Sequence, residues 1–369
     1  MFQKSQQRVI ELNPLRRVAR MQRAPQTETD ARSRVDRHLL VIGGAGYIGN
    51  VLIRKLLTLG YRVRCMDALY YPTGHTIAPL IDNDRFSFVL GDLRNVESRR
   101  DALVGITDVV LLASLVGDPI SKKYPEMSRE VNQTASCRLF SELAGRGLKK
   151  FVFTSTCSTY GIIEGNKPAT ESSPVSPRSV YAETKVAFEE YVLRHSNSVD
   201  FSPTILRLAT AFGLSPRMRF DLTISEFSRE LALGNELVVY DESTWRPYCH
   251  VSDISDAIIK VIEAPTDVVY GQVFNVGGNK NNFTKRMIVD ELRHLITDAK
   301  IGFKRGGADT RDYRVSFDKI RATLDFEPVY TVPNAIAKVV SCVNAGLYAD
   351  VDENEDFYGN YAVSPEEYT

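Results

Sequence analysis

Short runs of apolar residues alternate, from His38 onward, with longer stretches in which apolar positions recur at helical spacing. This order is typical of a parallel sheet covered by helices on both faces. Strands are predicted over residues 38–43, 61–66, 86–90, 108–113, 150–155 and 203–208, and helices over residues 47–59, 126–146 and 179–195. The pattern therefore predicts an α/β fold, with a doubly wound parallel sheet of the Rossmann type.

The same pattern divides the chain into four segments. Residues 1–36 show no sustained apolar period and are expected to be a flexible extension, because their acidic residues weaken the alternatives of a transit peptide or an arm for an anionic partner. Residues 37–212 form the predicted cofactor-binding domain. Residues 213–349 have shorter, irregular elements and predict mainly a smaller C-terminal substrate-binding lobe, with some chain returning to the first domain. Residues 350–369 are acidic and are expected to form a solvated tail.

Composition narrows the class of protein. The chain has 369 residues, of which 46 are basic and 46 acidic, so no overall field favours nucleic acid or a membrane as partner. Five scattered cysteines without zinc-ligand spacing indicate reduced thiols and no metal site. No apolar run is long enough to span a bilayer and no secretory signal is recognisable. We expect a soluble, cytoplasmic protein.

A glycine cluster lies where the first predicted strand meets the first predicted helix. Gly44, Gly46 and Gly49 satisfy G-x-G-x-x-G, and Gly43 adds a further glycine at the strand end. Glycines at these positions permit a tight turn and the close approach of a pyrophosphate to the helix N-terminus, where Tyr47 and Ile48 begin the helix. The cluster predicts a dinucleotide site.

Acidic residues after the next two strands strengthen this prediction. Asp67 ends the second strand about twenty residues past the glycines, where a carboxylate binds a ribose 2′-hydroxyl and repels a 2′-phosphate. The sequence therefore favours NAD over NADP as cofactor. Asp92 and Leu93 follow the next strand, from which side chains can reach the adenine.

Tyr181 and Lys185 form a second motif. Residues four apart lie on one face of a helix, so both side chains can point into one cleft. A nearby cation lowers the pKa of a tyrosine hydroxyl, which would make Tyr181 a general base near neutral pH.

Together with the stretch from Thr154 to Gly161, these motifs resemble the extended short-chain dehydrogenase/reductase family, the NAD-dependent epimerase/dehydratases, over about residues 38–340. The resemblance implies a catalytic triad of Thr156, Tyr181 and Lys185. It also implies cofactor contacts from the fourth-strand motif Leu112, Ala113 and Ser114, and it matches Asn132 to a helix asparagine of the family. The implied partner is a nucleotide-sugar substrate.

The resemblance also bears on the reaction, which is expected to start with oxidation at sugar C4 to a 4-keto intermediate. The 4,6-dehydratases of the family carry Asp and Glu after the catalytic Thr, whereas this chain has Cys157 and Ser158. A 4-epimerase or dehydrogenase needs no such carboxylates. The alternatives are a 4,6-dehydratase, a decarboxylase, a 3,5-epimerase that uses Cys157 as proton donor, and a non-catalytic NAD-binding scaffold or sensor.

Several residues are expected to contact the substrate. Arg246, in the segment that matches the family's R-x-x-x-H-V motif, would pair with the diphosphate, and Arg314 is the next candidate. The remaining expected contacts are Cys157, Ser158, Arg217 and Arg219, and Arg311 is a further cationic candidate. By resemblance, the helices over residues 126–146 and 179–195 would form a homodimer interface.

Overall fold

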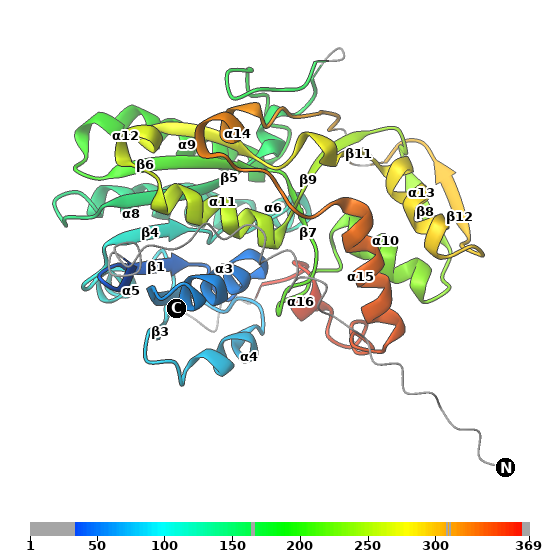
Figure 1. The fold of residues 1–369 in the computed structure, drawn as a ribbon, viewed down its shortest axis with the longest axis horizontal. Helices are drawn as coiled ribbons and strands as arrows, with labels where there is room; N and C mark the ends of the chain where they lie inside the picture. The colour runs from blue at the N-terminus through cyan, green and yellow to red at the C-terminus, as the bar shows by residue number, and fades with distance from the viewer. Residues whose placement is uncertain (1–33, 164–166, 308, 310, 364–369) are drawn as a thin grey trace.

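The computed structural model describes residues 34–163, 167–307, 309 and 311–363. Within them lies a seven-stranded sheet whose neighbouring strands all pair in parallel (Figure 1). In spatial order its strands are β10 (Gln272–Val276), β6 (Ser202–Leu208), β5 (Lys150–Thr156), β4 (Asp108–Leu111), β1 (His38–Ile42), β2 (Arg62–Asp67) and β3 (Phe86–Leu90). The order reverses between β1 and β4, which is where open α/β sheets bind ligands. The predicted doubly wound sheet is confirmed.

Helices cover both faces of this sheet, because side chains along each strand point alternately to one face and the other. In β1, Leu39 and Val41 belong to the core that includes α3 (Tyr47–Thr58) and α11 (Val251–Glu263). Leu40 and Ile42 belong to the opposite core, formed with α5 (Val96–Ala102), α8 (Ser136–Glu142) and α9 (Val180–His195). The continuous apolar run of the first strand thus reflects burial on both faces.

The smaller lobe, on the right of the large sheet in Figure 1, has its own core. Its sheets are β11 (Asn282–Thr284), β9 (Trp245–His250) and β7 (Thr210–Phe212), and β12 (Ile301–Lys304) with β8 (Leu237–Tyr240). Its main helices are α10 (Thr223–Ala232), α13 (Lys285–Leu295) and α15 (Val332–Asn344). Leu231, Leu237, Ile288 and Ile336 are among the residues that meet in this core.

Shorter elements complete the described chain. They are α4 (Gly74–Ile77), η1 (Ala78–Leu80), α6 (Asp118–Lys123), η3 (Cys157–Tyr160), η4 (Ser196–Ser198), α12 (Thr266–Val269), η5 (Asn279–Asn281), α14 (Asp318–Leu324) and α16 (Glu355–Tyr358). None of the helices in the described part of the chain has the length and apolar character that crossing a membrane requires.

The helix predicted over residues 126–146 contains a wide turn. It runs from α7 (Pro125–Arg129) through a π-helical turn, η2 (Glu130–Ala135), into α8. Asn132, inside this turn, accepts a hydrogen bond from the amide of Leu115 at 2.8 Å and donates to the hydroxyl of Thr184 at 3.2 Å. π-Helical turns are rare in proteins, and those that do occur are often at functional sites. Here the turn ties the loop after β4 to α9.

The chain ends differ from the sequence prediction in one respect. Most of the extension predicted over residues 1–36 lies outside the described residues. The prediction of a solvated acidic tail holds for the described acidic residues, which are exposed, but it is wrong for Val351, residues 357–360 and Val363, which are buried. The amide of Phe220 donates to the Tyr358 carbonyl at 2.7 Å. Alternation of exposed acids with a few apolar anchors hid this packing from the sequence pattern.

Candidate active site

The glycine turn between β1 and α3 leaves no room for side chains. Gly43 has a φ of +86°, and a Cβ there would lie 2.5 Å from the backbone nitrogen of Ala113. A Cβ on Gly49 would lie 2.5 Å from the Gly43 carbonyl oxygen. The helix therefore starts against bare backbone, with Gly46 as an N-cap that has no side chain. Such a helix N-terminus is suited to a phosphate group.

Asp67 lies beside this turn. Its carboxylate accepts hydrogen bonds from the amides of Ala45 and Leu69, both at 2.9 Å. Burial raises the pKa of Asp67, while these two amides and the charge of Arg217 oppose the rise. The structure thus places Asp67, the residue predicted to bind the ribose 2′-hydroxyl, at the glycine turn.

Two other predicted cofactor contacts lie at the turn itself. The hydroxyl of Tyr47 donates to the Gly213 carbonyl at 2.5 Å, and its ring packs in a core that also contacts Ile48. The first residues of α3 therefore join the glycine turn to the segment after β7.

The loops after β3 and β4 carry the remaining predicted cofactor contacts. The carboxylate of Asp92 accepts hydrogen bonds from Tyr70 and Arg94, and Leu93 is buried in the core. The amides of Leu112 and Ala113 both donate to the Ile42 carbonyl, at 2.9 and 2.8 Å. This places the end of β4 against the glycine turn.

Ser114, the next residue after these two, has a buried hydroxyl with no hydrogen-bond partner among the described residues. A buried hydroxyl without a partner is costly, so a bound group that supplies one would stabilise the site. Together with the bare glycine turn and the carboxylate of Asp67, this hydroxyl fits a dinucleotide at the carboxyl edge of the sheet.

Thr156, Tyr181 and Lys185 come together at the end of β5. Thr156 is the last residue of the strand, and its hydroxyl accepts a hydrogen bond from the Ser158 amide at 3.1 Å. Tyr181 and Lys185 are buried one turn apart on α9. The Lys185 ammonium donates to the Thr154 carbonyl at 3.0 Å and lies 5.8 Å from the centroid of the Tyr181 ring. The predicted triad shares one site.

The electrostatics of this triad differ from the prediction. Burial, and then the negative charge of Asp118, raise the pKa of the Tyr181 hydroxyl above its usual range, against the opposing effects of Arg219 and the Thr156 hydroxyl. Burial lowers the pKa of Lys185 to about 7. Without a further positive charge, Tyr181 therefore holds its proton at neutral pH.

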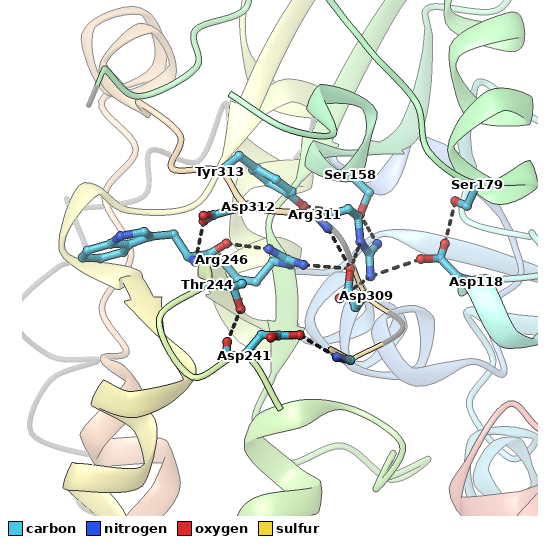
Figure 2. Close-up of polar contacts among 12 residues, drawn as sticks. Asp118, Ser158, Ser179, Asp241, Thr244, Arg246, Asp309, Arg311, Asp312 and Tyr313 are labelled. Carbon is cyan, nitrogen blue, oxygen red and sulfur yellow. Dashed lines mark hydrogen bonds and ion pairs between the residues drawn. The ribbon is translucent and has the colours of Figure 1, made fainter. Parts of the chain in front are cut away.

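Arg311 connects this site to the smaller lobe (Figure 2). Its guanidinium donates to the Ser158 hydroxyl at 3.0 Å and lies 3.1 Å from the carboxylate of Asp118. It also contacts Asp309, which lies 2.9 Å from Arg246. The charges of the two arginines lower the pKa of Asp309 despite its burial. A chain of alternating charges thus runs from the loop after β4 to β9.

Asp118 is fixed from a second side. The hydroxyl of Ser179, which caps α9, donates to Asp118 at 2.6 Å. The sequence prediction named Arg311 only as a further candidate and did not name Asp118, Asp309 or Ser179. No local motif marks the last three, because their meeting depends on how the lobe docks onto the sheet.

Cys157 and Arg314 are less favourably placed for contact with a substrate than the sequence suggested. The Cys157 thiol is in the hydrophobic core and donates to the Arg207 carbonyl at 3.2 Å, and burial raises its pKa well above the usual range. This placement agrees with a packing role. The Arg314 guanidinium stacks on Trp245, 5.1 Å from the ring centroid.

The other two predicted substrate arginines lie near the cofactor side of the site. Arg219 forms a paired contact with Asp221, with its Nε 2.8 Å from a carboxylate oxygen. Arg217 is 2% exposed and lies 4.9 Å from the ring centroid of Tyr71, which is in the loop after β2. Geometry therefore associates Arg217 with Asp67 and Tyr71.

Comparison with known proteins agrees with this arrangement. The model of the NAD dependent epimerase/dehydratase family matches residues 39–277. A low-salt glycan biosynthesis protein of Haloferax volcanii is 30% identical over 311 residues, which cover 82% of this chain and 97% of that protein. The UDP-glucose 4-epimerase of Mycolicibacterium smegmatis is 28% identical over 315 residues, covering 82% and 96% of the two chains.

Solved structures show the same fold. A UDP-glucuronic acid 4-epimerase from Bacillus cereus, in complex with UDP-glucuronic acid and NAD, superposes with a TM-score of 0.77 at 24% identity, covering 84% of this chain and all of that one. A dTDP-glucose 4,6-dehydratase from Streptomyces venezuelae, with NAD bound, gives a TM-score of 0.76 at 24% identity, covering 88% and 100%. Since both reaction types share the fold, the fold alone does not distinguish them.

Proposed function

Because this chain belongs to the NAD dependent epimerase/dehydratase family, we propose that it is a nucleotide-sugar 4-epimerase. NAD is the cofactor, and when bound it accepts and returns a hydride and adds the positive charge of its nicotinamide. Gly43, Gly46, Asp67 and Ser114 are the residues that would hold it. The proposed reaction inverts C4 through a 4-keto sugar.

The proposal is carried by the two positions that follow Thr156. Elimination of water, as in a 4,6-dehydratase, requires an acid and a base near C5 and C6 of the sugar. Here the Cys157 thiol points into the core, and the Ser158 hydroxyl accepts a hydrogen bond from Arg311. Inversion at C4 requires only one group that removes and returns the proton of the C4 hydroxyl. The site has such a group in Tyr181.

The proposed roles follow from the geometry of the triad. Tyr181 takes the proton from the C4 hydroxyl, and Thr156 orients that hydroxyl by a hydrogen bond. The ammonium of Lys185 lies close enough to stabilise a tyrosinate. The raised pKa of Tyr181 means that its proton leaves only when positive charge accumulates beside it. Tyr181 is thereby expected to act as a base only when the positively charged nicotinamide is in place.

The substrate's diphosphate is proposed to bind near Arg246. The Arg246 guanidinium lies 5.3 Å from the ring centroid of Tyr313 and contacts Asp309. A planar guanidinium pairs well with phosphate oxygens. Since Asp309 already bridges Arg246 and Arg311, an arriving diphosphate would compete with this carboxylate. The sugar end would then face Ser158 and Thr156.

The experiment is a panel of UDP-glucose, UDP-glucuronic acid, UDP-arabinose and dTDP-glucose, given to the purified protein with NAD. Proton NMR of a product with inverted C4 and unchanged mass supports the proposal. Loss of 18 mass units, the mass of water, would establish a dehydratase. Release of NADH with an oxidised sugar would establish a dehydrogenase, and loss of carbon dioxide from UDP-glucuronic acid a decarboxylase. Binding of NAD without turnover of any sugar would support a scaffold or sensor.

We also propose that the protein is a homodimer formed through α7, η2, α8 and α9. These segments pack on one another, and Cys137, Ser141 and Tyr191 line a groove between them. Sedimentation of the purified protein is expected to give twice the chain mass. A monomer mass at micromolar concentration would contradict the proposal.

A further inference from the structure

Residues 357–363, here called the C-terminal strap, cross the carboxyl edge of the large sheet. At one end, the ring of Phe357 lies 4.4 Å, centroid to centroid, from that of His75 in α4, which follows β2. Further along, the side-chain amide of Asn360 donates to the carbonyl of Val116, after β4, at 3.0 Å. At the other end, Val363 is buried against Leu115.

The strand order fixes what lies beneath this strap. β1 is between β2 and β4 in the sheet. The strap contacts the chain after both neighbours, and Phe357 and Tyr358 share a core with Tyr47 and Ile48, the first residues of α3 after the glycine turn. The glycine turn from Gly43 to Gly46 is at the carboxyl end of β1. The strap therefore passes over the place where the diphosphate of a dinucleotide binds.

Arg217 connects the strap to the same place. Its guanidinium donates to the Gly359 carbonyl at 3.0 Å and to the side-chain oxygen of Asn360 at 2.8 Å. Its Nε and the hydroxyl of Tyr71, which lies against it, are both buried and have no hydrogen-bond partner among the described residues. Arg217 also lies close enough to Asp67 for its charge to lower the pKa of that carboxyl.

No carboxylate pairs directly with Arg217. Within the described chain it forms no ion pair, and its hydrogen bonds go to neutral oxygens. The nearest acid on its own segment, Asp221, is paired with Arg219. Burial, and then the charge of Arg219, lower the pKa of Arg217 to about 10, although the charges of Asp221 and Asp67 oppose this shift. A buried cation without a directly paired anion is costly, so this position favours an anionic ligand.

We propose that Arg217 and the C-terminal strap complete the dinucleotide site, with Arg217 donating to the diphosphate of NAD and the strap enclosing the bound cofactor. The strap then slows the release of NAD between the two hydride transfers. The role of the strap in slowing NAD release rests on the proposed epimerase function, because a 4-epimerase must keep its cofactor through both transfers, whereas a net dehydrogenase must release it. The contact of Arg217 with the diphosphate concerns NAD binding alone.

The test measures how fast bound NAD leaves the full-length protein in the absence of any sugar. Protein loaded with NAD is mixed with excess fluorescent etheno-NAD, and the exchange rate is followed by fluorescence. Asn360→Ala removes the hydrogen bonds of the Asn360 side chain with Val116 and Arg217, and is expected to raise the release rate at least tenfold. The matched control is Asn354→Ala, whose side chain bonds only to Asp350 within the tail, and it should exchange at the wild-type rate.

A second variant tests the cationic contact. Arg217→Gln is expected to weaken equilibrium binding of NAD at least tenfold, and the loss should be smaller for nicotinamide mononucleotide, which lacks a diphosphate. Wild-type release from Asn360→Ala would overturn the role of the strap, and wild-type affinity in Arg217→Gln would overturn the cationic contact. If Arg217→Gln does not fold, Arg217→Lys, which keeps the charge but lacks the planar fork, takes its place, and wild-type affinity for NAD in that variant would overturn the cationic contact. If the wild-type protein retains NAD but turns over no sugar, the proposed epimerase function is refuted, whereas the proposed role of the strap in NAD retention still stands.

Discussion

Arg311 donates a hydrogen bond to the hydroxyl of Ser158 at 3.0 Å, although the two residues are 153 positions apart in the chain. Ser158 follows Thr156, the proposed catalytic threonine, by two positions, so this contact brings a charged side chain of the smaller lobe to the edge of the proposed reaction site. The same guanidinium contacts Asp118 on the cofactor-binding domain. The sugar site is therefore expected to form only when the two parts of the protein are docked.

Arg311→Lys tests this contact. Lysine keeps the charge but lacks the planar fork that reaches Ser158, Asp118 and Asp309 together. We expect kcat/KM for the accepted sugar nucleotide to fall about tenfold, the equivalent of one lost hydrogen bond of about 1.4 kcal/mol. The content of bound NAD should not change. Arg321→Lys, an exposed arginine on α14, is the control, and an equal loss in both variants would contradict the prediction.

Tyr181→Phe removes the proposed base. Turnover is expected to fall on the order of 100-fold or more, the scale for the loss of a general base. The affinity for NAD should change little, as measured by fluorescence titration. Tyr270→Phe, which removes a hydroxyl that donates to the Ser196 carbonyl at the opposite edge of the sheet, should retain activity. Turnover of the Tyr181→Phe variant at the wild-type rate would exclude Tyr181 from the mechanism.

Cys157→Ala separates a packing role from a chemical one. The thiol is buried and its pKa is raised by burial, so the variant is expected to lose about 1 kcal/mol of unfolding free energy and to keep its activity within a few-fold. Urea unfolding and initial rates give the two quantities. Cys249→Ala, at another fully buried thiol, provides the comparison for packing alone. A loss of 100-fold in rate with unchanged stability would restore Cys157 as a proton donor.

Lys185 makes the stability of the NAD-free protein depend on pH. Burial lowers its pKa from 10.5 to about 7 in the folded protein. Between pH 7 and 10.5 the unfolded chain therefore binds a proton that the folded chain does not, so this group makes folding more favourable as pH rises through that window. Below pH 7 both the folded and the unfolded chain bind this proton, so the full free-energy cost of burying the Lys185 ammonium destabilises the folded protein.

Lys185→Met removes this dependence. Relative to the wild type, the variant is expected to be stabilised most at pH 6.5 and progressively less at pH 8 and 9.5, as measured by urea unfolding. Lys122→Met, at an exposed lysine, should track the wild type at each pH. A stability difference between Lys185→Met and wild type that does not vary with pH would show that the ammonium is not buried in the NAD-free state.

Local pattern was sufficient to predict six of the seven strands of the large sheet and the elements that carry the proposed cofactor and triad residues, whereas β10 lies in the stretch 213–349, where only some returning chain was predicted. The strand over residues 86–90 coincides with β3, and the helix over 179–195 differs from α9 by one residue. These segments are recognisable because buried parallel strands are continuously apolar, and because the glycine turn depends on neighbours in sequence. Thr156 and Tyr181 were placed together by resemblance, and the sheet order explains why they meet.

Contacts between the two parts of the protein could not be predicted from the sequence. Arg217 was assigned to the substrate because it lies in the lobe, yet it contacts Tyr71 and the end of the chain. The strap contains no acidic residue, but it directly follows the acidic run from Asp352 to Asp356, and its anchors, Phe357 and Val363, are six positions apart with no period. Such contacts depend on the relative placement of distant segments, which propensity and spacing do not encode.

The wide turn of η2 has a consequence for how the chain can vary in length. A π-helical turn takes up one residue more than an α-helical turn, so deleting one residue from Glu130–Ala135 would convert it to α-helix without rotating the segment beyond it. Leu139 and Phe140 would keep their buried positions, whereas Asn132, inside the turn, would lose its alignment with Thr184. The packing of this helix should therefore tolerate the loss of one residue, and the cost of the deletion should fall on the link between the loop after β4 and α9.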